Sequence, residues 1–417
     1  METSHGDNFA PLRWRHHVAI ADEILAALDP DQRAVALATR GPVCVIAGAG
    51  TGKTRAITHR IAYAAAIGTM DPQKVLALTF TAKAAGEMRA RLRTWGMPTV
   101  AARTIHAAAL RQLLYFWPSV FGGRTPDLMT TKTGFLTEAI NRAGLSEFVR
   151  STNRELMRDI ASEIEWAKVS QVAPSDYVDE ISKRIQKPRV LPEQMVQIYT
   201  AYESIKKQEL AIDFEDVLLL TVGMLEEDQT ARERVRDQYR YFTVDEYQDV
   251  SPLQQRLLNL WLGNRDDICV VGDASQTIYS FAGATSAFLL NFTKRFPNAQ
   301  KFHLTRGYRS TPEIISSANS ILRSAGVIGI ATPELASANA NGSKPEVLGF
   351  ASNKDEVLAV VNSISEIIKS APNERVLSEI AVLARTNSQL ESFERELNNS
   401  GVATQLKSAE KFFDRVE

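Results

Sequence analysis

The order of hydrophobic and polar positions along the chain predicts a parallel sheet with helices between its strands. Four short apolar runs, each followed by a polar or glycine-rich turn, are typical of strands buried on both faces. These runs are Pro42–Ala47, Lys74–Phe80, Tyr241–Asp245 and Ile268–Gly272. Apolar residues at helical spacing lie between them, as over residues 57–65, with Gly68 as the expected end of that helix. This alternation predicts an open α/β sheet.

Residues 109–212 have a different pattern. They show helical spacing of apolar residues, little strand signal and polar connections. Arg154–Lys168 and Glu193–Leu210 are the clearest helical segments. We therefore expect an all-helical insertion within the α/β domain.

A second β/α pattern begins near residue 300. We expect strands and helices to alternate over Phe302–Leu304, Thr311–Leu322, Val347–Phe350, Glu356–Lys369 and Ile380–Ala384. The stretch Gly326–Lys344 is rich in Ala, Ser, Asn, Gly and Pro, which predicts a loop.

Composition excludes several classes of protein. The 417 residues are 44% hydrophobic and 23% charged, as in ordinary globular chains, and the length suggests about two to four domains. No run of about 18 apolar residues appears, and the first residues lack the pattern of a signal peptide. Cys44 and Cys269 both lie in apolar runs, so we expect buried free thiols in a reducing compartment.

Charge is informative locally rather than globally. The chain has 48 Lys and Arg against 49 Asp and Glu, a net charge of −1. Residues 83–124, in contrast, hold seven basic side chains against Glu87, a local charge of +6. Such a stripe is typical of a contact with a polyanion, although a solvated helix face is the alternative. The basic residues are Lys83, Arg89, Arg91, Arg93, Arg103, Arg111 and Arg124.

One glycine-rich segment has the spacing of a phosphate-binding loop. It follows a predicted strand, opens a predicted helix and reads Ala47-Gly48-Ala49-Gly50-Thr51-Gly52-Lys53-Thr54. Small residues let backbone N–H groups surround phosphate oxygens, and the helix start adds partial positive charge. Lys53 would reach the β- and γ-phosphates, and Thr54 would place its hydroxyl on Mg²⁺. Ala47 stands where the strict pattern has glycine, and a glycine-rich turn without a ligand is the alternative.

Two carboxylates, Asp245 and Glu246, follow another predicted strand. In open α/β sheets, ligands bind at the carboxyl ends of the strands. Asp245 suits a direct or outer-sphere contact with Mg²⁺, and Glu246 suits the general base that activates a water molecule. A base for water separates a hydrolase from a P-loop kinase, which must exclude water. The alternative is a solvated acidic turn.

A third polar segment, Gly272-Asp273-Ala274-Ser275-Gln276, ends the apolar strand before it. The neutral amide of Gln276 suits the orientation of a water molecule or of a γ-phosphate. Taken alone, the segment also fits a simple turn.

These segments resemble, in order, the motifs of the superfamily 1A DNA helicases, the UvrD/Rep/PcrA family. The phosphate loop resembles motif I and Thr79–Met88 motif Ia. Val244–Asp249 resembles motif II and Gly272–Tyr279 motif III. Tyr308-Arg309-Ser310 with Ala318-Asn319 resembles motif IV, and Ile380–Asn387 resembles the segment that follows it. The resemblance spans residues 28–417.

The resemblance implies a RecA-like P-loop parallel sheet with an all-helical insertion and a second, incomplete RecA-like domain. Residues 1–108 and 213–298 would form the first motor domain and 109–212 the insertion. Residues 299–417 would form the first part of the second motor domain, ending before its own insertion. We recognise no counterpart of motifs V and VI within the 417 residues.

The resemblance also implies roles in binding ATP and Mg²⁺ for matched residues. Gln32 would read adenine through its amide, although it also fits the third position of a helix capping box. Arg55 and Tyr308 would flank the adenine, and Arg309 would reach the γ-phosphate. Gln276 would couple the γ-phosphate to DNA.

Aromatic side chains would meet single-stranded DNA, because every base offers a face for stacking. The resemblance assigns Phe80, His106, Tyr279 and Phe281 to this role, whereas a core position for the phenylalanines and a satisfied polar position for the histidine are the alternatives. Phe281 stands where the family usually has tryptophan, and Ala282 replaces a frequent cationic neighbour.

The implied function is an ATP-dependent 3′–5′ DNA helicase or translocase core that acts in repair or replication. Its partners would be single-stranded DNA, 3′-tailed duplex DNA and repair proteins, and it would be a cytoplasmic, nucleoid-associated monomer with no membrane partner. Without motifs V and VI, we expect its DNA-stimulated ATPase to be impaired. The alternative is a truncated or regulatory ATP-gated module that binds single-stranded DNA with little hydrolysis.

Overall fold

A computed structural model describes residues 20–145, 154–184, 188–327, 332–370 and 374–406. The outer ends of the first and last expected domains, and residues 328–331 of the expected loop, lie outside these ranges. The chain divides into two compact units, one up to Gly342 and the other from Ser343. This division does not coincide with the boundary at residue 299 that the sequence predicts.

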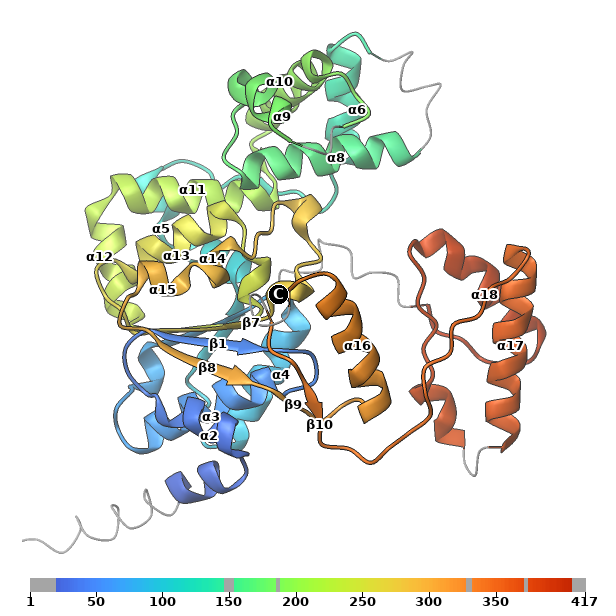
Figure 1. Ribbon diagram of the computed structural model, residues 1–417. Coiled ribbons are helices and arrows are strands. Elements are labelled where there is room, and N and C mark those ends of the chain that lie inside the picture. The colour runs from blue at the N-terminus through green and yellow to red at the C-terminus, as the bar shows by residue number, and fades with distance from the viewer. Residues whose placement is uncertain (1–19, 146–153, 185–187, 328–331, 371–373, 407–417) are drawn as a thin grey trace, which may run out of the picture. The chain divides into compact units, whose positions relative to one another are not determined.

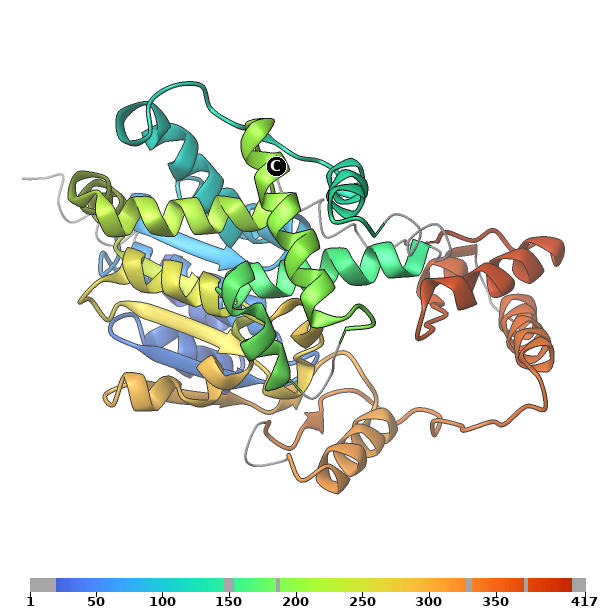
Figure 2. The ribbon, with the colours of Figure 1, turned by 90° about the horizontal axis from the view of Figure 1, so that it is seen from above.

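The larger unit is built on a six-stranded sheet whose strands are all parallel, which confirms the α/β fold expected from the pattern. In Figure 2 the visible strand arrows accordingly point the same way. Each of the four expected strands is present within one residue of its predicted bounds. In spatial order the strands are β3 (Ala101–Thr104), β2 (Val75–Thr79), β6 (Tyr241–Val244), β7 (Ile268–Gly272), β1 (Val43–Ala47) and β8 (Gln300–Leu304).

The two edge strands differ from the sequence prediction. The short β3 has alternating burial rather than a continuous apolar run, and the pattern missed it. The pattern grouped β8 with the later β/α segment, but its backbone pairs with β1, with Val43 opposite Gln300. A strand pairs with whichever sheet has an unpaired edge strand beside it, and the order of elements in the sequence does not decide which sheet that is.

Helices cover both faces of the sheet (Figure 1). Side chains of β1 alternate, so Val43, Val45 and Ala47 enter one core and Cys44 and Ile46 the other. One face packs on α2 (Pro30–Leu37), α3 (Lys53–Ala66) and α4 (Ala82–Thr94). The opposite face packs on α5 (Ile105–Val120), α11 (Phe214–Glu227), α12 (Gln229–Gln238), α13 (Pro252–Leu262), α14 (Ala287–Leu290) and α15 (Phe292–Arg295).

Side-chain caps fix the starts of several of these helices. The Asp29 carboxylate accepts from the backbone N–H of Gln32 at 2.8 Å and starts α2. Asp213 and Asp216 form a reciprocal capping box at the start of α11. Among the described residues, no helix has the length and apolar character that a membrane crossing requires.

The helical insertion has a core of its own. The core is formed by apolar residues between Met129 and Ile205. Residues 109–120, which the pattern assigned to the insertion, belong instead to α5 and pack on the sheet through Ala109, Leu113 and Phe116. The elements of the insertion are β4 (Asp127–Leu128), α6 (Thr133–Arg142), α8 (Arg154–Val169), α9 (Tyr177–Ser182), α10 (Pro192–Gln208) and β5 (Ala211–Ile212).

In its described residues, the segment after β8 contains two very short strands and one helix. β9 (Arg306–Gly307) pairs in parallel with β10 (Ala336–Ser337), and α16 (Pro312–Ser324) lies between them in sequence. The helix confirms the predicted one, whereas β10 lies inside the stretch predicted as a loop. A two-residue ladder is too short to leave a hydrophobic signature in the sequence.

The smaller unit contains α17 (Asn353–Ser370) and α18 (Asn387–Asn399), which pack through Val357, Val361 and Leu397. The strands predicted at 347–350 and 380–384 are wrong, because neither segment forms a ladder. Within the described part of this unit, no neighbouring strand takes up their backbone groups. Val347 and Leu383 are accordingly exposed, 98% and 90%, whereas Ile380 and Val382 pack partly against the core between α17 and α18.

Both cysteines are free and buried, as expected. They lie on the neighbouring strands β1 and β7, yet they enter the cores on opposite faces of the sheet. Burial raises the pKa of the Cys44 thiol to about 12 and also raises that of Cys269. The thiolate is the reactive form, so both groups are protected by burial and by protonation.

We expect neither thiol to react with DTNB at pH 8 while the protein is folded, and both of its two cysteines to react in denaturing urea. Release of thionitrobenzoate at 412 nm measures the reaction, and Cys44→Ala should halve the amplitude in urea. Fast reaction of the folded protein would show that the sheet opens readily.

Candidate functional site

The turn between β1 and α3 has the form of a phosphate cradle. Gly50 and Gly52 have φ of +76° and +80°, which favour glycine, and the Thr51 hydroxyl donates to the carbonyl of Gly48 at 2.9 Å. In the described chain no side chain caps the start of α3. The first N–H groups of the helix, with their partial positive charge, therefore suit an anion.

Lys53 and Thr54 face the two carboxylates that follow β6. The Thr54 hydroxyl donates to Asp245 Oδ2 at 2.9 Å, and Lys53 Nζ lies 3.7 Å from Glu246 Oε2. Glu246 has a left-handed backbone, with φ of 51°. The structure thus brings together the lysine and the carboxylates that the sequence placed almost two hundred residues apart.

Asp245 is a buried carboxylate whose negative charge is only partly compensated by the positive charge around it. Burial and the neighbouring Glu246 raise its pKa to about 6, against the opposing effects of the Thr54 hydrogen bond and Lys53. A hard divalent cation beside Thr54 and Asp245 would reverse this, because Mg²⁺ prefers a few oxygen ligands and stabilises the charged carboxylate. The donor set therefore fits Mg²⁺.

Three residues predicted to bind the base lie around the same loop. The Gln32 carboxamide donates to the carbonyl of Thr51 at 3.0 Å, so its backbone serves the helix cap while its side chain reaches the loop. The Arg55 guanidinium donates to the carbonyl of Ala27, and the Tyr308 hydroxyl donates to Asp29. Arg55 and Tyr308 are thus anchored at the two ends of the turn before α2.

Arg309 approaches the loop from the segment after β9. A Cβ added to Gly50 would lie 2.8 Å from Arg309 Cβ, and the N–H of Tyr308 donates to the carbonyl of Gly50 at 2.9 Å. The segment therefore packs directly on the cradle, and Gly50 is required by this close approach as well as by its φ.

Gln276 lies on the short helix η4 (Ala274–Gln276) beyond the end of β7. Its carboxamide donates to Asp273 Oδ2 at 2.8 Å. Gln248, which no sequence pattern marked as functional, bonds both Glu246 and the backbone of Asp273 through its carboxamide. The only available signal was its position inside the segment Val244–Asp249.

The structure brings three of the four predicted DNA-facing rings together. The ring centroids of Phe80 and Tyr279 are 4.7 Å apart, and those of Tyr279 and Phe281 are 6.1 Å apart. Phe281 is 57% exposed. His106 does not join them, because it is buried at the start of α5 and meets Phe214 edge to face.

The basic residues of 83–124 are distributed over several elements. Arg89 donates to the carbonyl of Ala102 at 2.9 Å, and Arg124 pairs with Asp127 at 2.8 Å. Both therefore have structural partners. The exposed members are Lys83, Arg91, Arg93, Arg111 and Arg124.

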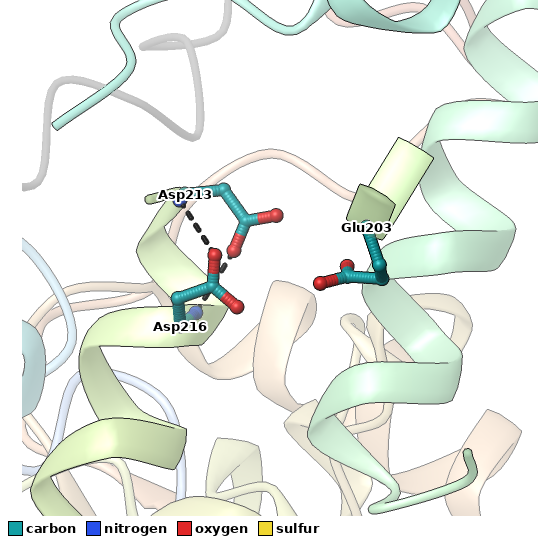
Figure 3. A group of neighbouring side chains, drawn as sticks. All are labelled: Glu203, Asp213 and Asp216. Atoms are coloured by element: carbon teal, nitrogen blue, oxygen red, sulfur yellow. Dashed lines mark hydrogen bonds between the residues drawn. The ribbon is translucent and has the colours of Figure 1, made fainter. Parts of the chain in front are cut away.

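A second group of carboxylates lies where the insertion meets α11. Figure 3 shows Glu203, Asp213 and Asp216, whose oxygens lie within 4.8 Å of one another. Lys168 and Lys206 occupy the positions that a metal would need, with Nζ 2.7 and 3.1 Å from Asp213. The cluster is therefore a buried ionic joint rather than a metal site.

Lysine side chains compensate the charge of Asp213 in this joint. Burial by itself would raise the pKa of Asp213, but Lys168, Lys132 and Lys206 outweigh it and hold that pKa well below its usual range. Lys168 is 1% exposed and bonds both oxygens of Asp213.

Comparison with known proteins agrees with this geometry. A family model described as the UvrD/REP helicase N-terminal domain matches residues 28–297, and one described as the UvrD-like helicase C-terminal domain matches residues 302–417. The ATP-dependent DNA helicase UvrD2 of Mycobacterium bovis is 43% identical over 95% of this chain and 57% of its own length. The ATP-dependent DNA helicase PcrA of Leuconostoc citreum is 30% identical over 91% of this chain and 49% of its own. The chain thus spans about half the length of the curated relatives it matches.

We expect Lys168→Ala to lower the free energy of unfolding by about 3–5 kcal/mol, because it leaves buried carboxylates without their cation. Urea unfolding followed by circular dichroism measures the change. The matched control is Lys183→Ala in the same insertion, where the exposed pair with Glu180 should contribute little. Equal effects of the two substitutions would contradict a buried joint.

Proposed function

Because this chain belongs to the UvrD/REP helicase family, we propose that it is a DNA-stimulated ATPase that moves 3′ to 5′ along single-stranded DNA during repair or replication. The observation that carries the proposal is the convergence of Lys53 and Glu246 at 3.7 Å beside the cradle. A triphosphate needs a cation at its terminal phosphates, and its hydrolysis needs a base for water.

The phosphate end of the site has complementary roles for five side chains. Lys53 would neutralise the β- and γ-phosphates, and Thr54 with Asp245 would hold Mg²⁺, which would spread the negative charge of the phosphates. Glu246 takes the proton of the attacking water. Arg309, which packs on Gly50 from the segment after β9, is placed to sense the γ-phosphate. The backbone of the cradle, Ala47-Gly48-Ala49-Gly50-Thr51-Gly52, would hold the remaining phosphate oxygens.

The base end would be formed by Gln32, Arg55 and Tyr308. The Gln32 amide lies on the cradle and can read the edge of adenine, and the Tyr308 ring can stack on its face. Tyr308 is 42% exposed, so a ring face is free of the core. Arg55 and Tyr308 share the turn around Asp29, which positions them on one side of the loop.

The exposed ring of Phe281 and the half-buried rings of Phe80 and Tyr279 would form a stacking platform for bases. Stacking tolerates any sequence, which suits an enzyme that moves along DNA. We propose 3′-tailed duplex DNA as a substrate, repair proteins as partners, and a monomer that works at the nucleoid in the cytoplasm. Residues up to 120 and 213–304 would form the first motor domain, because α5 packs on the sheet and β8 pairs with β1. Residues 121–212 would form the insertion, and the chain after 304 part of the second motor domain.

A second candidate is an ATP-gated module that binds single-stranded DNA and hydrolyses ATP slowly. It is favoured by the packing of Arg309 on Gly50, because an arginine placed there can bind a γ-phosphate whether or not hydrolysis follows. An arginine at the γ-phosphate is worth about 10³–10⁵ in rate, so the number of such arginines decides the turnover. Steady-state ATPase with and without single-stranded DNA distinguishes the two candidates.

We expect Lys53→Ala to abolish DNA-stimulated ATP hydrolysis and to leave DNA binding without nucleotide nearly unchanged. A coupled ATPase assay and fluorescence anisotropy of a labelled oligonucleotide measure the two properties. Lys74→Ala is the control. Lys74 is exposed and precedes β2, so it lies at the amino ends of the strands, opposite the cradle. Loss of DNA binding together with hydrolysis would refute separate sites.

Phe281→Ala should weaken the binding of single-stranded DNA by about 1–3 kcal/mol through the loss of one stacking ring. Titrations at several salt concentrations should give parallel slopes, because no phosphate contact is removed. Tyr115→Ala, which removes a 69% exposed ring on α5, is the control. If both substitutions weaken binding equally, the platform is not at Phe281.

A further inference from the structure

We propose that Gln248 is a positioning residue that links the carboxylate of Glu246 to the segment carrying the DNA-facing rings. The inference rests on the proposed function and deepens it, since it concerns how the nucleotide site and the DNA surface communicate. Through the buried carboxamide of Gln248, a change at Glu246 would reach residues 273–281.

The carboxamide of Gln248 is bonded at both of its ends. Its Nε2 donates to Glu246 Oε2 at 2.7 Å, and its Oε1 accepts from the backbone N–H of Asp273 at 3.1 Å. The residue is 1% exposed, so water does not replace either bond readily. A carboxamide carries a donor and an acceptor on one rigid plane, and displacement of one end therefore moves the other.

The backbone around Gln248 is shaped for this contact. A Cβ on Gly272 would lie 2.5 Å from Gln248 Oε1 and 3.2 Å from its backbone nitrogen. Any larger residue at 272 would force the carboxamide away from Asp273. On the other side, Glu246 is turned by its left-handed backbone, and its N–H donates to Asp245 Oδ1 at 3.0 Å.

The contact continues from Asp273 towards the rings. Asp273 Oδ2 accepts from Gln276 at 2.8 Å, and Asp273 Oδ1 accepts from the N–H of Ser275 at 3.0 Å. These bonds hold the turn that leads within three residues to Tyr279, whose ring meets Phe80. A second connection runs from Gln248 Nε2 to Asp249 Oδ2 at 3.3 Å.

A bound triphosphate would compete with Glu246 for Lys53, and this competition would cause the Glu246 carboxylate to move. Among the described residues, the Glu246 carboxylate lies 3.7 Å from Lys53 Nζ and accepts from Gln248 at 2.7 Å. A triphosphate attracts the Lys53 ammonium more strongly than one carboxylate does, because it carries more charge. Once Lys53 turns to the phosphates, the hydrogen bond from Gln248 is what holds the Glu246 carboxylate. Movement of that carboxylate then moves Gln248, which in turn moves the backbone of Asp273. A ligand shifts a conformational equilibrium only through such differential contacts.

The test compares Gln248→Met with Gln255→Met in the full 417-residue chain. Gln255 is also a buried glutamine, 4% exposed, but it bonds Tyr247 and Asn259 instead. Anisotropy of a labelled oligothymidylate gives the DNA dissociation constant with and without Mg²⁺ and a non-hydrolysable ATP analogue. The ratio of the two constants is the coupling between the sites.

We expect a ratio of about tenfold in the parent chain and in Gln255→Met, within the usual range of coupling energies. In Gln248→Met the ratio should fall to within about twofold of one, while the affinities for DNA alone and for the analogue alone change less than about threefold. Hydrogen–deuterium exchange should also rise in residues 273–281 of Gln248→Met and remain unchanged in β7. Gln248→Asn, too short to span both partners, should behave likewise and serves if the methionine variant does not fold.

A ratio in Gln248→Met equal to that of the parent chain would overturn the inference and leave the proposed function standing. Equal loss in Gln248→Met and Gln255→Met would also overturn it, because general loosening would then explain the effect. A parent chain whose DNA affinity is the same with and without the analogue would overturn the inference as well, whereas failure of DNA to stimulate its ATPase would overturn the proposed function.

Discussion

The structure depends on the end of its parallel sheet at which the carboxyl ends of the strands lie together. β1 and β6 are separated by β7, yet both strands end at the same edge, so the lysine after one meets the carboxylates after the other. Parallel strands always bring their carboxyl ends to one edge, which is why ligand sites form there. The cap of α2, the approach of Arg309 to Gly50 and the bonds of Gln248 are all arranged around this meeting of charges.

Two buried acidic groups show how charge balance separates a ligand site from a structural joint. In the joint, Lys168 and Lys206 lie 2.7 and 3.1 Å from Asp213, so the protein supplies the compensating cations itself. At the carboxyl ends of β1 and β6, Lys53 is the cation that faces Asp245 and Glu246 within the described part of the chain, and the pKa of Asp245 is raised to about 6. A buried carboxylate requires a partner, and there the requirement is only partly met by the chain.

Secondary structure could be predicted wherever burial and periodicity agree. The four central strands are buried on both faces, and their continuous apolar runs gave bounds within one residue. Prediction failed at edges and in short pieces, as for the missed β3 and the misgrouped β8. It also failed at 347–350 and 380–384, where apolar residues suggested strands but Val347 and Leu383 are exposed. A strand forms only when it pairs with a neighbouring strand, and the residues of one segment do not show whether such a neighbour is available.

The sequence by itself determined the cradle, the Asp245–Glu246 pair and their order, because each is a local pattern within about eight residues whose chemistry is fixed by residue type. The tertiary structure alone decided which distant groups meet. It placed the Gln248 carboxamide on the backbone of Asp273, 25 residues away, buried His106 against Phe214, and paired Lys168 with Asp213 across 45 residues. Such contacts depend on how strands and helices pack, and packing is a property of the whole fold rather than of any one segment.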